Sequence, residues 1–161
     1  MKRKVAMICC LLWMGFIFYQ SSRTGDSSNE ISHEIVNQLA NPAKQPQPVE
    51  ESTTEVKNQE VKNSPSLKKL NVLIRKSAHA FEFLVLALLL GWVLSEYEMS
   101  SWKLICFTML GVLLYAASDE FHQLFVEGRT ARLFDVMIDC IGGVIGILLF
   151  ETIRRLKKKD L

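Results

Sequence analysis

Four apolar blocks dominate this chain, and they limit it to folds in which most helices lie in a membrane. The blocks cover residues 5–19, 78–97, 102–117 and 133–153. Each is close to the roughly 20 residues, at about 1.5 Å rise per residue, that an α-helix needs to cross a bilayer. The 49% hydrophobic content is therefore an average over apolar blocks and a polar stretch at 20–69. The sequence predicts an all-α integral membrane protein with four transmembrane helices.

The first apolar block has the flanking charges of a secretory signal or of a short membrane anchor, because three cations occupy positions 2–4. Its length does not separate these two possibilities. Residues 20–23 offer no small-x-small cleavage site, and the residues before the cysteine pair at 9–10 do not form a lipoprotein cleavage box. We therefore expect residues 1–20 to be the first transmembrane helix, as an uncleaved signal anchor.

Charge and cysteine usage exclude several other classes of protein. A net charge of +2 is too small for a nucleic-acid binder, and no basic stripe with interleaved aromatic residues is present. The four cysteines include no Cys-x-x-Cys pair and lie in apolar runs, so we expect them to act as small apolar residues. We expect no cofactor and no nucleic-acid partner.

Basic residues near both termini set the expected orientation in the membrane. Cations cluster at 2–4 and again within 154–159, and an even number of spans places both clusters on the same side. By the positive-inside rule this side is the cytoplasm. Both termini are therefore expected inside the cell membrane, with residues 154–161 as a basic cytoplasmic tail. Residues 21–66 are then expected outside, as a polar, partly disordered extracellular segment.

Within this outer segment, composition distinguishes two parts. Residues 41–66 contain all four prolines among Gln, Glu, Lys, Ser and Thr, and bury too little apolar surface to offset chain entropy. We predict a disordered spacer there. Apolar residues at helical spacing within 31–39 predict a short amphipathic helix before the spacer.

Residues 67–153 are predicted to form a membrane domain of three helices. Apolar residues at 67, 70, 73 and 74 predict that the helix of the second span begins early, near Ser66. Only residues 98–101 separate the second span from the third, which predicts an antiparallel helical hairpin. The third span is longer than its apolar block if the polar residues 118–123 are also helical.

Ionisable residues at the ends of the last three spans mark a candidate site, because such residues are costly inside a membrane. At 100° per residue, Arg75, His79 and Glu82 fall within about 60° of arc on one face of the second span. Asp135 and Asp139 are one turn apart at the start of the fourth span. These groups all lie at the predicted outer ends of their helices.

The end of the third span completes this set, since Asp119, His122 and Gln123 share one helical face. A compact bundle can bring all three groups into one outward pocket. The candidate pocket residues are Lys76, His79, Glu82, Asp119, Glu120, His122, Gln123, Arg129, Arg132, Asp135 and Asp139.

Two glycines indicate which way the acids of the fourth span face. Gly142 and Gly146 continue the stripe of Asp135 and Asp139, and small residues allow another helix backbone to come close. The acidic stripe is therefore expected to face protein. A carboxylate facing lipid would cost on the order of 2 to 4 kcal/mol.

Three chemistries are open to this set of residues. A structural network would pair the cations with the acids and fix the order of the helices. A recognition site would use Arg129 and Arg132 to fork onto a phosphate or carboxylate, with the acids binding hydroxyls or amines. A catalytic site would use His79 or His122 as a general base oriented by a carboxylate, or a divalent metal on His, Asp and Glu. No metal ligand and no catalytic residue can be assigned from the sequence.

Three motifs follow one another along the last three spans: RKSAHAFEF at 75–83, SDEFHQ at 118–123 and GRTAR at 128–132. With the acids and glycines of the fourth span, they resemble the VanZ family of bacterial membrane proteins. The resemblance covers about residues 73–149 and is joined by SSRTG at 21–25. It implies a protein of Gram-positive bacteria, associated with teicoplanin resistance. The motif residues it carries over are Lys76, His79, Glu82, Asp119, Glu120, His122, Gln123, Arg129, Asp135 and Gly142.

The chain departs from the pattern of this family at two positions. Phe83 stands where the family often has Tyr, and Asp139 stands where it usually has Asn. A protonated Asp139 would donate a hydrogen bond as Asn does, whereas an ionised Asp139 would need a nearby cation. The resemblance therefore predicts architecture better than mechanism.

Two functional hypotheses remain. The first is a non-enzymatic envelope protein whose outward pocket binds a membrane lipid or a lipid-linked cell-wall precursor by its headgroup, and so influences glycopeptide susceptibility. The second is a membrane-embedded enzyme that acts on a lipid or sugar headgroup through His, Asp and Glu chemistry. An ion pathway is disfavoured, because the acids of the spans are expected at one end of the bundle only.

Overall fold

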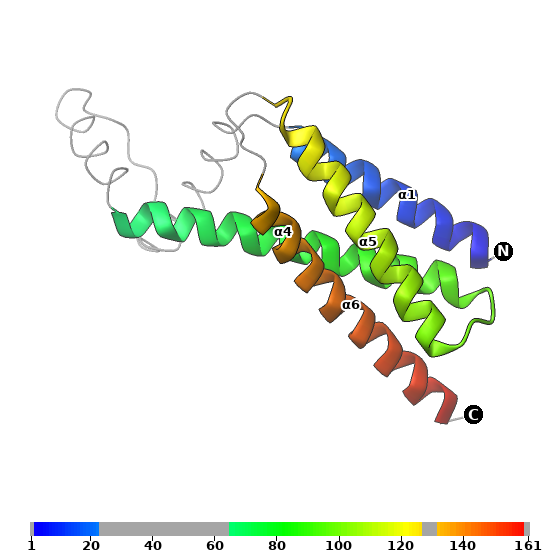
Figure 1. The fold of residues 1–161 in the computed structure, drawn as a ribbon. Coiled ribbons are helices and arrows are strands. Elements are labelled where there is room, and N and C mark those ends of the chain that lie inside the picture. The colour runs from blue at the N-terminus through cyan, green and yellow to red at the C-terminus, as the bar shows by residue number, and fades with distance from the viewer. Residues whose placement is uncertain (1, 23–64, 127–131, 160–161) are drawn as a thin grey trace, which may run out of the picture.

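The computed structural model describes residues 2–22, 65–126 and 132–159, and within these ranges the chain is helical with no strand. The helices are α1 (Lys2–Ser21), α4 (Pro65–Ser95), α5 (Ser101–Gln123) and α6 (Leu133–Lys159). The predicted amphipathic helix at 31–39 and nearly all of the predicted spacer lie outside the described residues. Both termini and the α4–α5 turn lie at one end of the bundle (Figure 1).

Each of these four helices is long and apolar enough to cross a membrane. This confirms the predicted all-α, multi-pass membrane protein. The crossing stretches are Lys2–Ser21, Val72–Ser95, Ser101–Gln123 and Leu133–Lys157.

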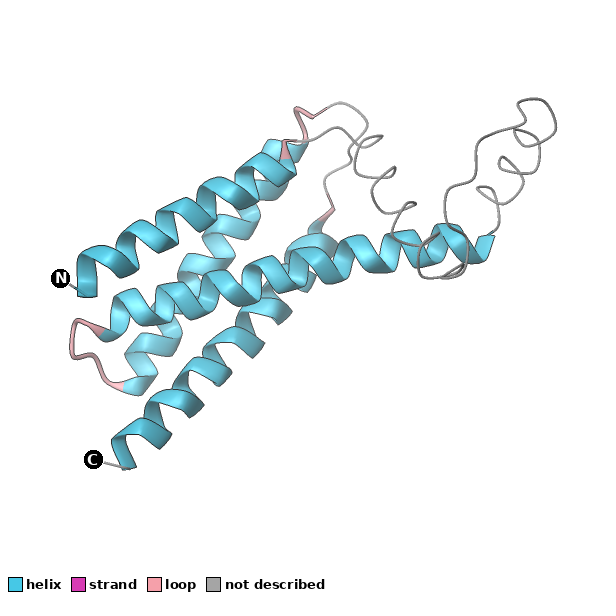
Figure 2. Cartoon of the chain, turned by 180° about the vertical axis from the view of Figure 1, so that it is seen from behind, coloured by secondary structure: helices cyan, strands magenta, loops and turns pink. Residues whose placement is uncertain are grey.

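The observed helix bounds agree with the predicted bounds in two places, and in a third the helix is longer than predicted. Helix α4 begins at Pro65, next to the predicted start at Ser66, because proline is well tolerated in a first helical turn. Its first turns extend beyond the other helices, as Figure 2 shows from behind. Helix α5 includes the polar residues 118–123. Helix α6 continues to Lys159, past the predicted span end at 153, since the residues that follow are mostly good helix formers without Gly or Pro.

The closest packing in the bundle is between α4 and α6, where two glycines of α6 meet the backbone of α4. A Cβ atom added at Gly142 would overlap the carbonyl oxygen of Ala80 and lie 2.8 Å from its carbonyl carbon. A Cβ atom added at Gly146 would overlap the carbonyl oxygen of Leu84 and lie 2.9 Å from the Cβ of Ala87. These contacts confirm the predicted small-residue face and set the side chains of α4 and α6 beside each other.

Helix α1 is joined to α4 and α5 by polar as well as apolar contacts. The indole N–H of Trp13 donates to the carbonyl oxygen of Glu82 over 2.9 Å, and the hydroxyl of Tyr115 donates to the carbonyl oxygen of Met14 over 2.5 Å. A cluster of buried apolar residues lies along this seam and includes Cys10, Ile17, Phe83, Leu86, Ala87, Val112 and Ala116. Helix α1 is thus a full member of the bundle.

Candidate functional site

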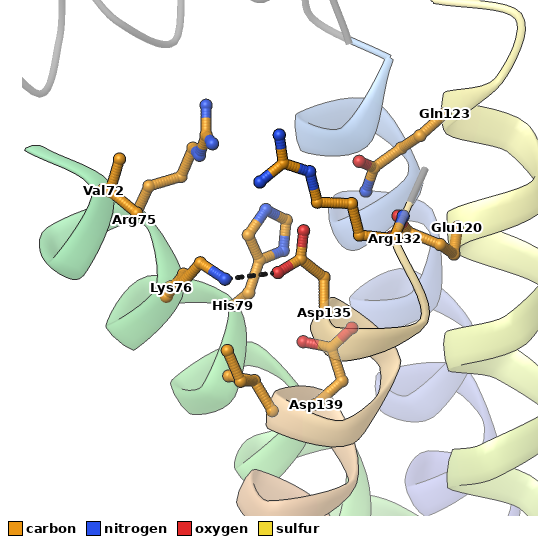
Figure 3. Close-up of a pocket in the computed structure, with 10 residues that line it drawn as sticks. Val72, Arg75, Lys76, His79, Glu120, Gln123, Arg132, Asp135 and Asp139 are labelled. Atoms are coloured by element: carbon orange, nitrogen blue, oxygen red, sulfur yellow. Dashed lines mark hydrogen bonds and ion pairs between the residues drawn. The ribbon is translucent and has the colours of Figure 1, made fainter. Parts of the chain in front are cut away.

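A cavity of about 190 Å³ lies between α4, α5 and α6 at the end of the bundle opposite both termini (Figures 1 and 3). It is formed by the N-terminal half of α4, the last turns of α5 and the first turns of α6. Its walls are formed by Val72, Arg75, Lys76, His79, Glu120, Gln123, Arg132, Asp135, Ile138 and Asp139. Seven of the predicted pocket residues are among them.

An ion pair closes one side of the cavity. The ammonium of Lys76 on α4 lies 2.7 Å from the carboxylate of Asp135 on α6 (Figure 3). The same ammonium lies 4.7 Å from the ring centre of Phe134. This pair ties the two helices together one turn before Ala80 on α4 and two turns before Gly142 on α6. Lys76 and Asp135 therefore have a structural partner in each other.

His79 lines the cavity, and Glu82 lies behind it on the same helix. The Nδ1 atom of His79 is 3.5 Å from a carboxylate oxygen of Glu82, which is longer than a good hydrogen bond. Glu82 is buried, and this oxygen has no hydrogen-bond partner among the described residues. A histidine is therefore oriented beside a buried carboxylate at the cavity wall.

Helix α5 contributes two buried acids and an amide. The side-chain amide of Gln123 donates to the carboxylate of Asp119 over 3.0 Å, and both side chains are buried. The carboxylate of Glu120 accepts from the backbone N–H of Arg132 at the start of α6. Glu120 and Gln123 line the cavity, whereas Asp119 lies behind them. These contacts hold the end of α5 against the start of α6.

Asp139 forms part of the cavity wall deeper in the bundle (Figure 3). Only 3% of its surface is exposed, and its Oδ1 atom has no hydrogen-bond partner among the described residues. Such a group is costly unless a donor reaches it.

The structure places His122 away from this cavity. Its Nε2 atom lies 3.1 Å from the hydroxyl of Ser22, and its ring centre lies 4.4 Å from that of Phe18. His122 therefore faces the end of α1. Arg129 lies outside the described residues.

Two arginines give the cavity its positive charge. Figure 3 shows the guanidinium groups of Arg75 on α4 and Arg132 before α6 turned toward the same space. Within the described ranges, neither forms an ion pair with an acidic side chain. In those ranges no group of three His, Cys, Asp or Glu side chains is arranged to hold a metal ion. The arrangement is suited to a planar, bidentate hold on an anion.

The set of candidate residues taken from the sequence omitted three lining residues. Arg75 lies on the predicted polar face of its helix but is not one of the predicted pocket residues. Val72 and Ile138 are apolar and carry no chemical signal of their own. Helical spacing from Lys76 and Asp135 would have found both, because residues three or four positions away share a face.

Comparison with known proteins identifies the family of this chain. The profile of the VanZ/LLP1 family matches residues 6–154. The chain belongs to the VanZ/LLP1 family. The match confirms the resemblance carried by the three motifs, and it includes nearly all of α1 as well as the three helices around the cavity. Searches of curated proteins and of solved structures found no match.

Proposed function

We propose that this VanZ/LLP1 chain is a binding protein of the bacterial cell membrane, whose cavity takes the anionic headgroup of a lipid or of a lipid-linked cell-wall precursor. By holding that headgroup it influences how teicoplanin reaches its target. The single observation that carries the proposal is the pair of guanidinium groups, Arg75 and Arg132, that line one cavity without an acidic partner in the described residues.

The size of the cavity supports a small polar group as its occupant. A volume of about 190 Å³ corresponds to roughly six water molecules at about 30 Å³ each. A phosphate with a small substituent fits this space. The disaccharide and peptide of a wall precursor would stay outside it, so the recognised part is the phosphate end of such a molecule.

The orientation of the chain supports an outward cavity. Cations cluster near both termini, and both termini lie at the end of the bundle opposite the cavity (Figure 1). By the positive-inside rule that end is expected in the cytoplasm, and the cavity would then open at the outer face. Headgroups of the outer leaflet and extracellular glycopeptides meet at this face.

Binding is tested by titrating the purified protein in detergent with phosphatidylglycerol and with a polyprenyl phosphate, followed by native mass spectrometry. The Arg75→Gln/Arg132→Gln double variant is expected to bind at least about tenfold more weakly, because charge-assisted hydrogen bonds to the anion are lost. Lys103→Gln is the matched control, since Lys103 is an exposed cation at the other end of α5. Equal affinity of the double variant and the control would overturn the proposal.

The effect on glycopeptides is tested in cells. Expression of the wild-type chain is expected to change the teicoplanin susceptibility of a host strain, and the double variant is expected not to, at equal membrane abundance. A double variant that retains the full effect at equal abundance would separate the phenotype from the cavity.

A second candidate function rests on His79 beside Glu82. A histidine at a cavity wall, with a carboxylate behind it, is the arrangement of a general base. Such an enzyme would modify a headgroup held by the arginines. Incubation with the same lipids and mass spectrometry of the products tests it: a product formed by the wild type and not by His79→Gln would support catalysis, and unchanged lipids would support binding alone.

A further inference from the structure

The charges around the cavity are ordered by depth in the bundle. Arg75 lies one helical turn outside His79 on α4, and Asp139 lies one turn deeper than Asp135 on α6, which is about 6 Å along the axis. The cavity is thus positive near its outer end and carboxylate-lined at its inner end (Figure 3). A simple anion would be matched by the first part and not by the second.

The carboxylate of Asp139, at the inner end of the cavity, has no ion-pair partner among the described residues. Asp139 is 97% buried, yet its Oδ1 atom has no hydrogen-bond donor among the described residues. The ammonium of Lys76 is engaged by Asp135 over 2.7 Å. The Oδ1 atom of Asp139 is closed off from the cavity, but Asp139 also lines the cavity wall. A positively charged donor on a molecule bound at that wall would offset the buried negative charge of the carboxylate.

We propose that the cavity recognises a phosphate ester that carries a primary ammonium group, of which phosphoethanolamine is the simplest. The phosphate lies between the guanidinium groups of Arg75 and Arg132, and the ammonium donates to Asp139. This inference rests on the proposed function, keeps its anion site and adds a cation subsite. A hydroxyl in place of the ammonium would donate one hydrogen bond but would leave the carboxylate charge without a counter-charge.

The choice of probes separates the two subsites without changing the protein. Wild-type protein in dodecyl maltoside is titrated calorimetrically with phosphoethanolamine, phosphocholine, glycerol phosphate and inorganic phosphate. Phosphocholine keeps the positive charge but has no N–H donor, and glycerol phosphate has hydroxyls in place of the ammonium. Phosphoethanolamine is expected to bind at least about tenfold more tightly than either. Equal affinities for the three esters would overturn the inference.

Variants of the protein then test which residue binds the phosphate and which binds the ammonium group. Asp139→Asn, which preserves the shape of the side chain, is expected to abolish the preference for phosphoethanolamine over glycerol phosphate. Arg132→Gln is expected to weaken the binding of all phosphates. Glu96→Gln is the control for loss of one negative charge, because Glu96 is an exposed acid in the turn that follows α4, away from the cavity.

The outcomes distinguish this inference from the proposed function. A preference that persists in Asp139→Asn overturns the ammonium subsite, while loss of phosphate binding in Arg132→Gln still supports the anion site. Loss of neither overturns both. Phosphatidylethanolamine in mixed micelles is the second arm, and tighter binding of this lipid than of free phosphoethanolamine identifies a membrane headgroup as the source.

Discussion

Substitution of Gly142 by alanine gives the sharpest prediction about the packing that forms the cavity. The added Cβ would overlap the carbonyl oxygen of Ala80 and lie 2.8 Å from its carbonyl carbon, about 0.6 Å inside the ordinary limit of 3.4 Å. The obstacle is backbone, so α4 and α6 must separate. Overpacking of this kind costs about 3 kcal/mol at the upper end of its usual range, and alanine returns about 1 kcal/mol through helix propensity. We expect a net loss of about 2 kcal/mol.

The assay is reversible unfolding in detergent, with ligand titration on the same samples. Because Lys76 on α4 and Asp135 on α6 flank the cavity, separation of the helices should also weaken phosphate binding by Gly142→Ala. Gly15→Ala is the matched control, since a Cβ added there meets nothing within 4 Å. It should be neutral or up to about 1 kcal/mol more stable. If Gly142→Ala is as stable as Gly15→Ala, the close α4–α6 contact is wrong.

Three further changes test individual contacts by unfolding in detergent. Lys76→Gln should lower the free energy of unfolding by at most about 1 kcal/mol, because the ion pair with Asp135 is partly exposed. The Lys76→Asp/Asp135→Lys exchange should restore most of this loss. If the exchanged variant is no more stable than Lys76→Gln, the ion pair does not contribute. Trp13→Phe removes the hydrogen bond to the Glu82 carbonyl and should cost about 1 kcal/mol. Tyr115→Phe removes the bond to the α1 backbone and should cost a similar amount. Wild-type stability in both would mean that α1 is not held by these bonds.

The sequence predicted the spans well because their signal is local. Hydrophobic length gives a helix that crosses the membrane, and the apolar residues after Pro65 gave the early start of α4. The glycines at 142 and 146 were informative for the same reason, since a small residue permits close approach whatever the partner is. Helical periodicity and the position of the polar residues at the helix ends also predicted most of the cavity residues.

What the sequence did not predict depends on how each helix is rotated against its neighbours. His122 and Gln123 are adjacent, yet His122 contacts α1 while Gln123 lines the cavity, because consecutive helical residues point about 100° apart. The sequence assigns both residues to one broad polar face, but it does not show which neighbouring helix each side chain contacts. The position of α1 in the bundle could not be predicted either. Its hydrogen bond from Trp13 is accepted by a backbone carbonyl, and every residue has one, so the sequence does not identify the acceptor.

The side of the membrane on which the cavity opens is tested by cysteine labelling in intact cells. With the native cysteines replaced by alanine, Arg132→Cys at the cavity and Lys103→Cys at the other end are treated with a membrane-impermeant maleimide. We expect Arg132→Cys to be labelled in intact cells and Lys103→Cys only after permeabilisation. Labelling of Lys103→Cys from outside, with Arg132→Cys protected until the cells are opened, would contradict an outward headgroup site.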